Sequence, residues 1–578
     1  MNDTNYGFHA DVIRKHIELV PGYKALAERL LPEIDISPDS VQQILDAAAK
    51  FAEEVLVPIN RIGDEKGCLI LNGRVRTAPG YREAWKSLAA AGWNSVDQPE
   101  EYGGQGLPTF VNAACRELFD RACMAIGMVS GPTRAATQVL MQFASDAIKE
   151  EWIPKFVTGE WAATICISEA DAGSDVGRIR SRATPSDDGT WRLTGEKMWT
   201  TFGDNDLVER IGHLVLARTP DAPPGSAGLS LFLVPNFVRD AAGALAPNGV
   251  QARRIEHKLG LHGSPTCAMG FEGAQCYLLG KQHRGLAQMF VMIQTMRQMV
   301  AIEGVGMAFG AEQVALGYAA ERRQGGDPSK PSIAISNHAD VQRQLMTMAS
   351  RVEVLHGLVY ELVIRIDAQQ LDSASAESNR PTTDNVAQWL LPIVKASCAD
   401  AGHEVPDEAI QVLGGAGYTT EWPVEQWMRD ARMMSIAEGT TGVQALDLVH
   451  RRLWRDNGRG LGEFLQVASN EVAAADSALA APAVATLAIL KAAGDAMLEL
   501  QSSPRDAEAG AVSFLRLAML GATGWIAVRL ASAPGEDRIT RRLAAAGKYW
   551  LSDLEARAAH AAKQATAGAS SLDFFEHI

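Results

Sequence analysis

The chain has 578 residues, a mass of 62.0 kDa and a formal net charge of −15. This length is too great for one ordinary hydrophobic core and predicts about three or four packed domains. The acidic charge argues against the broad basic surface with which nucleic-acid-binding proteins neutralise phosphates, so we expect no nucleic-acid partner.

The cysteine spacing and the N-terminal sequence indicate the cellular compartment of the protein. The seven cysteines form no CxxC pair and no regular spacing with histidine, so the sequence predicts neither a metal site nor a disulfide framework. The first residues lack the basic-then-apolar pattern of a signal peptide, and we expect no transmembrane segment of about 20 apolar residues. These patterns predict a cytoplasmic protein.

The N-terminal third is predicted to be helical. Residues 1–36 are expected to form an N-terminal extension, and residues 37–160 an N-terminal α domain. Ser37 is a suitable N-cap and Pro38 suits the first helical position, ahead of the amphipathic run VQQILDAAAKFAEEVL. The helical pattern resumes near residue 80, broken by the glycine-rich loop PEEYGGQGLP.

The pattern then changes twice. Residues 161–285 contain short β-rich runs such as HLVLARTP and GLSLFLVP, which predict an antiparallel β domain. Helical periodicity returns in residues 286–456 and predicts a C-terminal four-helix bundle domain. Residues 457–578 are Ala-rich and predict an appended helical domain of about four helices. The polar stretches 325–332 and 372–384 are expected to be connectors. The expected fold class is α+β multidomain.

Three segments, in this order, resemble the motifs of the acyl-CoA dehydrogenase family. They are CISEADAGSD, GEKMWTTFGD and QVLGGAGYTTEWPVEQWMRDARMMSIAEGT. The resemblance covers about residues 40–455. VLVPINRIGDEKGC and EGTTGVQALDL further resemble a bacterial subgroup with a C-terminal helical extension.

The family resemblance implies that an acyl-CoA thioester is desaturated between its α- and β-carbons, with FAD as cofactor and electron-transfer flavoprotein as electron acceptor. The reaction needs a base in a dry pocket, polarisation of the thioester carbonyl and a hydride acceptor. Glu438 matches the family's catalytic base. Some relatives carry the base at the position of Met296, which cannot abstract a proton.

The resemblance also implies FAD and substrate contacts. Trp199 is expected to pack on the isoalloxazine and Thr201 to donate at its N5, while the pyrophosphate is bound across a subunit interface. The implied FAD-binding residues are Ile165, Ile167, Ser168, Trp199, Thr201, Thr440, Arg322, Gln411 and Gly415. The implied substrate-binding residues are Ser174, near the CoA pantetheine, and Arg297, near the base.

Each of these residues also has an ordinary structural explanation. Trp199 can be a core indole, the Gly-Gly pair a tight interhelical turn, Ser174 a cap and Arg297 a salt-bridge partner. The methionines at 289, 292, 296 and 299 can line an acyl tunnel or belong to the core. Three positions depart from the family pattern, namely Ala170, Ala437 and Gly442.

The family resemblance leaves two alternative functions. A DNA-binding flavoprotein of this family is disfavoured, because residues 461–578 carry 10 Lys and Arg against 13 Asp and Glu, a local net charge of −3. An acyl-CoA oxidase uses the same base and flavin, so the sequence does not distinguish it from a dehydrogenase. We expect a homodimer, because the shared pyrophosphate site needs a second chain and the extension should cover the surface that smaller relatives use to form tetramers. The resemblance also implies a role in fatty acid β-oxidation.

Overall fold

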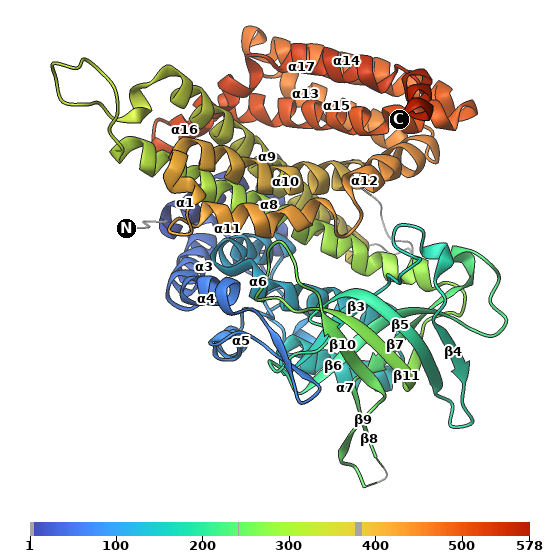
Figure 1. Ribbon diagram of the computed structural model, residues 1–578. Helices are drawn as coiled ribbons and strands as arrows, with labels where there is room; N and C mark the ends of the chain where they lie inside the picture. Colours follow the sequence, from blue (N-terminus) through green and yellow to red (C-terminus); the bar gives the residue numbers. More distant parts are fainter. Residues whose placement is uncertain (1–4, 241, 376–383) are drawn as a thin grey trace. The chain divides into compact units, whose positions relative to one another are not determined.

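The structure is a computed structural model that describes residues 5–240, 242–375 and 384–578. The chain divides into two compact units (Figure 1). The first unit comprises Met1–Ala49, Ala113–Arg121 and Val300–Ile578, and the second comprises Lys50–Asn112 and Ala122–Met299. Three helices contribute residues to both units: α3 (Pro38–Phe51), α6 (Thr109–Phe143) and α8 (Gly285–Glu321). Each unit therefore combines segments that are far apart in the sequence.

The amphipathic helix predicted near the N-terminus is confirmed. α3 begins at Pro38, and the Ser40 amide donates to Ser37 Oγ at 3.4 Å. The helix passes through a π-helical stretch, Ala52–Leu56, into the next helix. The remaining helices of the second unit are α4 (Val57–Lys66), α5 (Tyr81–Ala90) and α7 (Asp146–Val157).

The second unit contains a seven-stranded sheet with two small hairpins. The strand order is β10-β11-β5-β4-β6-β3, and β7 pairs with both β11 and β6. These strands are β3 (Trp161–Cys166), β4 (Arg182–Pro185), β5 (Trp191–Thr201), β6 (Arg210–Arg218), β7 (Leu229–Pro235), β10 (Val250–Ile255) and β11 (Thr266–Leu279). The hairpins are β1 (Leu69–Leu71) with β2 (Arg74–Arg76) and β8 (Phe237–Arg239) with β9 (Leu245–Pro247).

The predicted antiparallel pairing is confirmed for most strands of this sheet, but two of its strand pairs are parallel. β3 and β6 pair in parallel over their length, and β4 pairs in parallel with β6 at one position. The reason is that β4 and β5 lie between β3 and β6 in the chain, and this crossover returns β6 in the direction of β3. Short β-rich runs indicate strands, but they do not specify the directions of the strands.

Both faces of the strand β6 are buried. Leu214 and Leu216 of β6 belong to a core cluster that contains residues of α6, α7 and α8. Val215 and Ala217, on the alternate positions, belong to a second cluster that includes Val75 of β2. The strand β6 is therefore apolar on both sides, which explains its nearly continuous apolar sequence.

The first unit is helical. Two N-terminal helices, α1 (Tyr6–Leu19) and α2 (Pro21–Leu30), pack against α9 (Ala339–Ser375). α10 (Asn385–Leu413) packs against α9 and against the short helices α11 (Val424–Ala431) and α12 (Thr441–Asp447). Most of the predicted connector at 372–384 lies outside the described residues.

The appended helical region contains five α-helices among the described residues, not about four. They are α13 (Arg459–Ala473), α14 (Ser477–Glu499), α15 (Pro504–Ala531), α16 (Arg538–Leu551) and α17 (Leu554–Ala565). The extra break separates α16 from α17 at Ser552 and Asp553, where the sequence has neither glycine nor proline. α15 and α16 pack on α9, and α13 packs on α10. The extension therefore forms one unit with the bundle.

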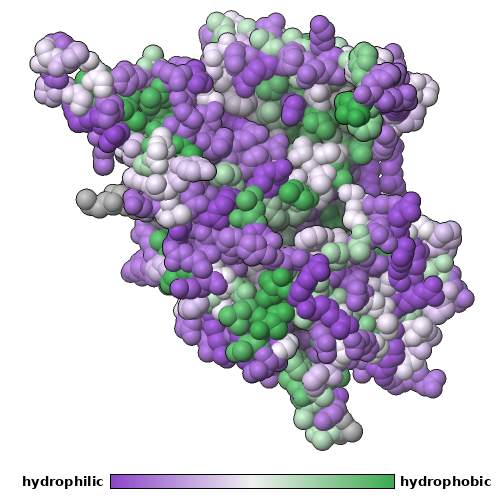
Figure 2. Space-filling view, in the orientation of Figure 1, coloured by the Kyte–Doolittle hydropathy of each residue, from purple (hydrophilic) through white to green (hydrophobic). Residues whose placement is uncertain are grey.

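Three described helical stretches have the length and apolar composition of a membrane span, namely Gly285–Glu321, Ser477–Ser502 and Pro504–Ala531. The expectation that no apolar run is this long is therefore wrong. Most of the apolar window is buried in the first and third, whereas the window in Ser477–Ser502 is 39% buried. Hydrophilic residues cover much of the visible surface, with separate apolar patches between them (Figure 2). Core packing explains the composition of the two buried helices.

Candidate active site

Glu438 lies on a tight turn of the first unit, between a short 3-10 helix, Arg432–Ser435, and α12. Its side chain is half-buried, and its φ of +54° is in the left-handed region. Residues other than glycine seldom adopt this conformation, and they keep it only where their surroundings hold it. Buried side chains of α10 and α12 hold this turn.

The first is Lys395 of α10, which is 0% exposed. Its Nζ donates to three main-chain carbonyl oxygens at 2.8 Å each, those of Met434, Ala437 and Gly439. Two of these carbonyls belong to the residues on either side of Glu438. A single buried ammonium thus binds the turn both before and after the candidate base.

The second is Gln444, a buried residue of α12. Its Nε2 donates to the carbonyl oxygens of Glu438 at 3.0 Å and Gly439 at 3.1 Å. Thr440 is the N-cap of the same helix, and its Oγ1 accepts a hydrogen bond from the Val443 amide at 3.2 Å. The implied FAD residue Thr440 therefore has a capping role, although its hydroxyl proton can still be donated.

Two buried acidic groups, Glu303 and Asp120, lie in the same unit as the candidate base. Glu303 of α8 is 1% exposed, and burial raises its pKa well above the usual value. The charges of Asp120 and Glu438 raise this pKa further, while Arg116 and Lys395 oppose the rise. Burial also raises the pKa of Asp120, to about 6, against its ion pair with Arg116. The half-buried Glu438 therefore lies close enough to this interior for its charge to affect Glu303.

The segments implied in flavin binding meet in the second unit. Ile165 lies in β3, and Ile167 and Ser168 follow the strand. The Met198 amide of β5 donates to the Ser168 carbonyl at 2.9 Å, and Lys197 Nζ donates to the Ile167 carbonyl at 3.0 Å. The ends of β3 and β5 therefore lie side by side, as the family resemblance requires.

Trp199 and Thr201 stand at the end of β5. Trp199 is 57% exposed and has a φ of +60°, so it is not a core indole. Thr201 and Ser168 are half-buried, and their hydroxyls lie on the two adjoining segments. An exposed flat indole on a segment that adjoins two hydroxyl groups suits a planar ring that accepts hydrogen bonds, such as the isoalloxazine of FAD.

The residues implied in pyrophosphate binding are exposed on the first unit. Arg322 follows α8, Gln411 lies in the last turn of α10, and Gly415 lies in the turn after it. Gly414 has a φ of +60°, which explains a glycine there, but Gly415 has an ordinary φ. A Cβ at Gly415 would meet no atom within 4 Å. The interhelical turn accounts for the first glycine and leaves the second without a structural reason.

The implied substrate residues lie in the second unit. Ser174 is exposed in the loop between β3 and β4, and Asp175, not Ser174, stands at the N-cap of the following short helix. Arg297 of α8 is buried, with its guanidinium over the Phe290 ring at 5.5 Å. The four methionines of this stretch belong to a core cluster, which favours the core explanation over an acyl tunnel: Met289, Met292, Met296 and Met299.

Sequence reasoning missed Lys395, Gln444 and Glu303. Lys395 is the single charged residue in the apolar run VAQWLLPIVKASCA, and Glu303 is the single charged residue in MVAIEGVGMAFGA. A lone charge in such a run must be paired or perturbed once the helix is buried, so both were detectable. Gln444 offered no such pattern.

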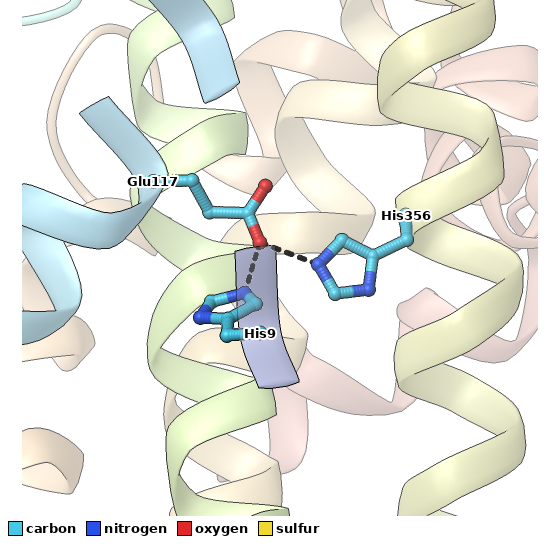
Figure 3. Close-up of side chains that lie close together, drawn as sticks. All are labelled: His9, Glu117 and His356. Carbon is cyan, nitrogen blue, oxygen red and sulfur yellow. Dashed lines mark hydrogen bonds and ion pairs between the residues drawn. The ribbon is translucent and has the colours of Figure 1, made fainter. Parts of the chain in front are cut away.

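A buried cluster elsewhere in the first unit has metal-ligating side chains. Glu117 Oε1 lies 2.6 Å from His9 Nε2 and 2.5 Å from His356 Nε2 (Figure 3). Donor atoms around a tetrahedral zinc stand about 3.3 Å apart, given bond lengths near 2.0 Å. Arg121 also donates to His9 Nδ1 at 3.0 Å, so the proton of neutral His9 is on Nε2 and points to Glu117. The cluster is a hydrogen-bond network rather than a ligand set.

Known proteins and family models match segments of both units. Family models of the acyl-CoA dehydrogenase N-terminal, middle and C-terminal domains match residues 38–160, 164–274 and 283–453. The 3-methylmercaptopropionyl-CoA dehydrogenase of Ruegeria pomeroyi is 37% identical over 522 residues, 88% of each chain. The broad-specificity linear acyl-CoA dehydrogenase FadE5 of Mycobacterium tuberculosis is 33% identical over 453 residues, covering 76% of this chain and 73% of its own.

Solved structures show the same fold. The FAD complex of an acyl-CoA dehydrogenase from Bacillus anthracis has a TM-score of 0.74 at 20% identity, covering 94% of this chain and 91% of that one. Butyryl-CoA dehydrogenase from Megasphaera elsdenii has a TM-score of 0.60 at 24% identity, covering 72% of this chain and 98% of that one. Together with the family models, these matches confirm the resemblance seen in the motifs. The chain belongs to the acyl-CoA dehydrogenase family, whose members are FAD-dependent oxidoreductases.

Proposed function

We propose that this protein desaturates an acyl-CoA thioester to the trans-2-enoyl-CoA, with Glu438 as the base that removes the α-proton. The α C–H bond breaks towards the Glu438 carboxylate, a double bond forms between the α- and β-carbons, and the β-hydrogen leaves as hydride. FAD supplies the hydride acceptor, its N5 atom. The proton is then held on Glu438 until the product leaves.

The observation that carries this proposal is the turn around Glu438. A carboxylate is presented on a left-handed backbone, held from both sides by Lys395 and Gln444, among buried charged groups. A surface glutamate needs none of these arrangements. A base that must meet one particular C–H bond does need a fixed position.

The FAD assignments belong to the same proposal. Ile165, Ile167, Ser168, Trp199 and Thr201 would hold the isoalloxazine, with Thr440 donating to the same cofactor. Arg322, Gln411 and Gly415 would reach the pyrophosphate of the FAD bound by a second copy. Their exposure in a single chain supports this arrangement, and it implies a homodimer. Ser174 would lie near the CoA pantetheine and Arg297 near the base.

Replacing Glu438 tests the proposal. Glu438→Gln keeps the shape and loses the base, so flavin reduction should fall by at least about 10² to 10⁴-fold while FAD and acyl-CoA still bind. Glu438→Asp should retain partial activity, because its carboxylate is set back from the α-carbon. Anaerobic stopped-flow bleaching of the flavin measures both rates. If Glu438→Gln reduces flavin at a rate near that of the wild type, Glu438 is not the base.

The electron acceptor distinguishes a dehydrogenase from an oxidase. We propose electron-transfer flavoprotein as the acceptor, in the cytoplasm and within acyl-chain β-oxidation. Mixing substrate-reduced enzyme with either electron-transfer flavoprotein or oxygen decides the point, because fast reoxidation by oxygen alone would mark an oxidase. A panel of acyl-CoA thioesters that includes the 3-methylmercaptopropionyl thioester would identify the acyl group.

A further inference from the structure

Lys395 lies at an unusual place for a lysine. It is 0% exposed within the apolar run of α10, and its ammonium donates to the three carbonyls named above. An ammonium has three N–H donors, and these three acceptors match that number. All three come from one short segment, the turn that carries Glu438.

The geometry of the contacts limits how this turn can move. The carbonyls of Ala437 and Gly439 bind the same Nζ at 2.8 Å, so the two residues flanking Glu438 are tied to one buried point. Gln444 adds a bond to the Glu438 carbonyl itself. The left-handed conformation at Glu438 persists only where neighbouring groups hold it. Lys395 and Gln444 hold it through their hydrogen bonds to the turn.

We propose that Lys395, assisted by Gln444, is a positioning residue that fixes the Glu438 carboxylate for proton abstraction. This inference rests on the proposed function of Glu438 as base. Neither residue touches substrate: both act on the main chain that bears the base. The charge of Lys395 also reaches the interior around Glu438, since it opposes the rise in the pKa of Glu303.

Lys395→Met in the FAD-loaded enzyme tests the proposal, because methionine fills similar space and donates no hydrogen bond. The rate of flavin reduction at saturating acyl-CoA should fall about 10²-fold, since small misplacements of a catalytic group cost that much. FAD content and the Kd of the enoyl-CoA product should stay within a few-fold of wild type. A rate within about three-fold of wild type would overturn the proposal.

Arg529→Met is the matched control. Arg529 is a buried cation of the same unit, and it pairs with Glu361 and Glu471. These partners lie on α9 and α13, and neither helix carries Glu438, Lys395 or Gln444. The control should lower the Tm while leaving the rate of flavin reduction unchanged. A loss of rate in this variant as large as in Lys395→Met would assign the effect to general destabilisation and overturn the proposal.

A double variant separates positioning from other roles. If Lys395 acts through Glu438, adding Lys395→Met to Glu438→Gln should cause no further loss of rate. If Lys395→Met lowers the rate of Glu438→Gln by the same factor by which it lowers the rate of the wild type, the proposal is overturned. A wild-type rate in Glu438→Gln alone would instead defeat the proposed function. If Lys395→Met yields no folded holoenzyme, Gln444→Leu decides in the same assay, and a rate within about three-fold of wild type overturns the proposal.

Discussion

Glu438 and Trp199 share a backbone conformation that their residue types seldom adopt, with φ values of +54° and +60°. One is the proposed base, and the other is the proposed platform for the flavin ring. Unusual backbone conformations collect at sites where a side chain must be aimed rather than merely packed. The sequence motifs single out the same two residues, so motif and backbone conformation point to the same positions.

Gly415 offers a residue-scale test of the shared FAD site. Gly415→Ala should leave the fold unchanged, because its φ is ordinary and no atom lies within 4 Å of the added Cβ. If the pyrophosphate of a neighbouring chain approaches this backbone, FAD affinity should fall about ten-fold or more, which is about 1.4 kcal/mol. Fluorescence titration of the apoprotein with FAD measures the affinity, and light scattering measures the dimer.

Gly414→Ala is the neighbouring control. Its left-handed φ of +60° should cost about 1 kcal/mol of stability on substitution, so this variant should lower the Tm. Wild-type FAD affinity in Gly415→Ala would show that this backbone does not approach the cofactor.

The site was only partly predictable at this scale. The motifs single out Glu438, Trp199 and the two strand ends, because each motif is one contiguous stretch of sequence. They did not identify Gln444, because its role depends on the folded turn, which brings the Glu438 carbonyl within reach of the Gln444 side chain. Lys395 and Glu303 were readable as lone charges in apolar runs, but their partners lie 30 or more residues away in the chain and no pattern names them.

At the scale of elements, a buried network joins four helices of the first unit. Glu117 of α6 binds His9 of α1 and His356 of α9, as Figure 3 shows. Glu353, also of α9, binds His16 of α1 at 2.7 Å and Arg542 of α16 at 2.5 Å. Buried polar groups of this kind are costly unless every partner is present, so the network selects one packing of these helices.

His356 gives this network a dependence on pH. Burial alone would lower the pKa of His356, but the Glu117 and Glu353 carboxylates outweigh it and raise that pKa to about 9. The imidazolium therefore stabilises the fold fully below its unfolded pKa of about 6.5, and this contribution is lost as the pH rises towards 9. Burial holds the pKa of His9 at about 4, so His9 does not titrate in this window.

We therefore expect the stability advantage of wild type over His356→Gln to shrink between pH 6.5 and 9, by about 1.4 kcal/mol for each pH unit. Glu117 and Glu353 stay ionised throughout, since their pKa values are held well below the usual range, and Tyr360 stays neutral. Urea unfolding of both proteins at several pH values measures the difference. A difference that stays constant across the window would mean that His356 is neutral in the fold.

The sequence predicted the order of the helices and strands better than it predicted which strands pair and in which direction. Helical and alternating periodicities marked where helices and strands lie, because they depend only on neighbours in the chain. The parallel pairing of β3 with β6 depends on how the chain crosses the sheet, and no local pattern records that path. The break between α16 and α17 was missed because a Ser-Asp pair ends the helix without glycine or proline.

At the scale of the whole molecule, compact units do not follow the linear order of segments. The N-terminal helices, a short piece of α6, most of the bundle and the C-terminal extension belong to the first unit. Two arginines of the extension connect it to the bundle: the buried Arg529 pairs with Glu361 of α9, and the half-buried Arg542 pairs with Glu312 of α8 and Glu353 of α9. The extension is therefore a structural part of this unit rather than a separable module.

Arg542 provides the test of this integration. Glu312 and Glu353 are both 0% exposed, so Arg542→Met would remove the guanidinium that binds two buried carboxylates. Removing one partner of a buried ion pair costs about 3–5 kcal/mol, and we expect a loss of this size in urea unfolding. The triple variant Arg542→Met, Glu312→Gln and Glu353→Gln should recover part of that loss, because neutral amides need no counter-charge. Lys491→Met is the control: its pair with Asp495 is exposed, so it should change stability by less than about 1 kcal/mol. If Arg542→Met unfolds like the control, the buried pairs do not hold the extension to the bundle.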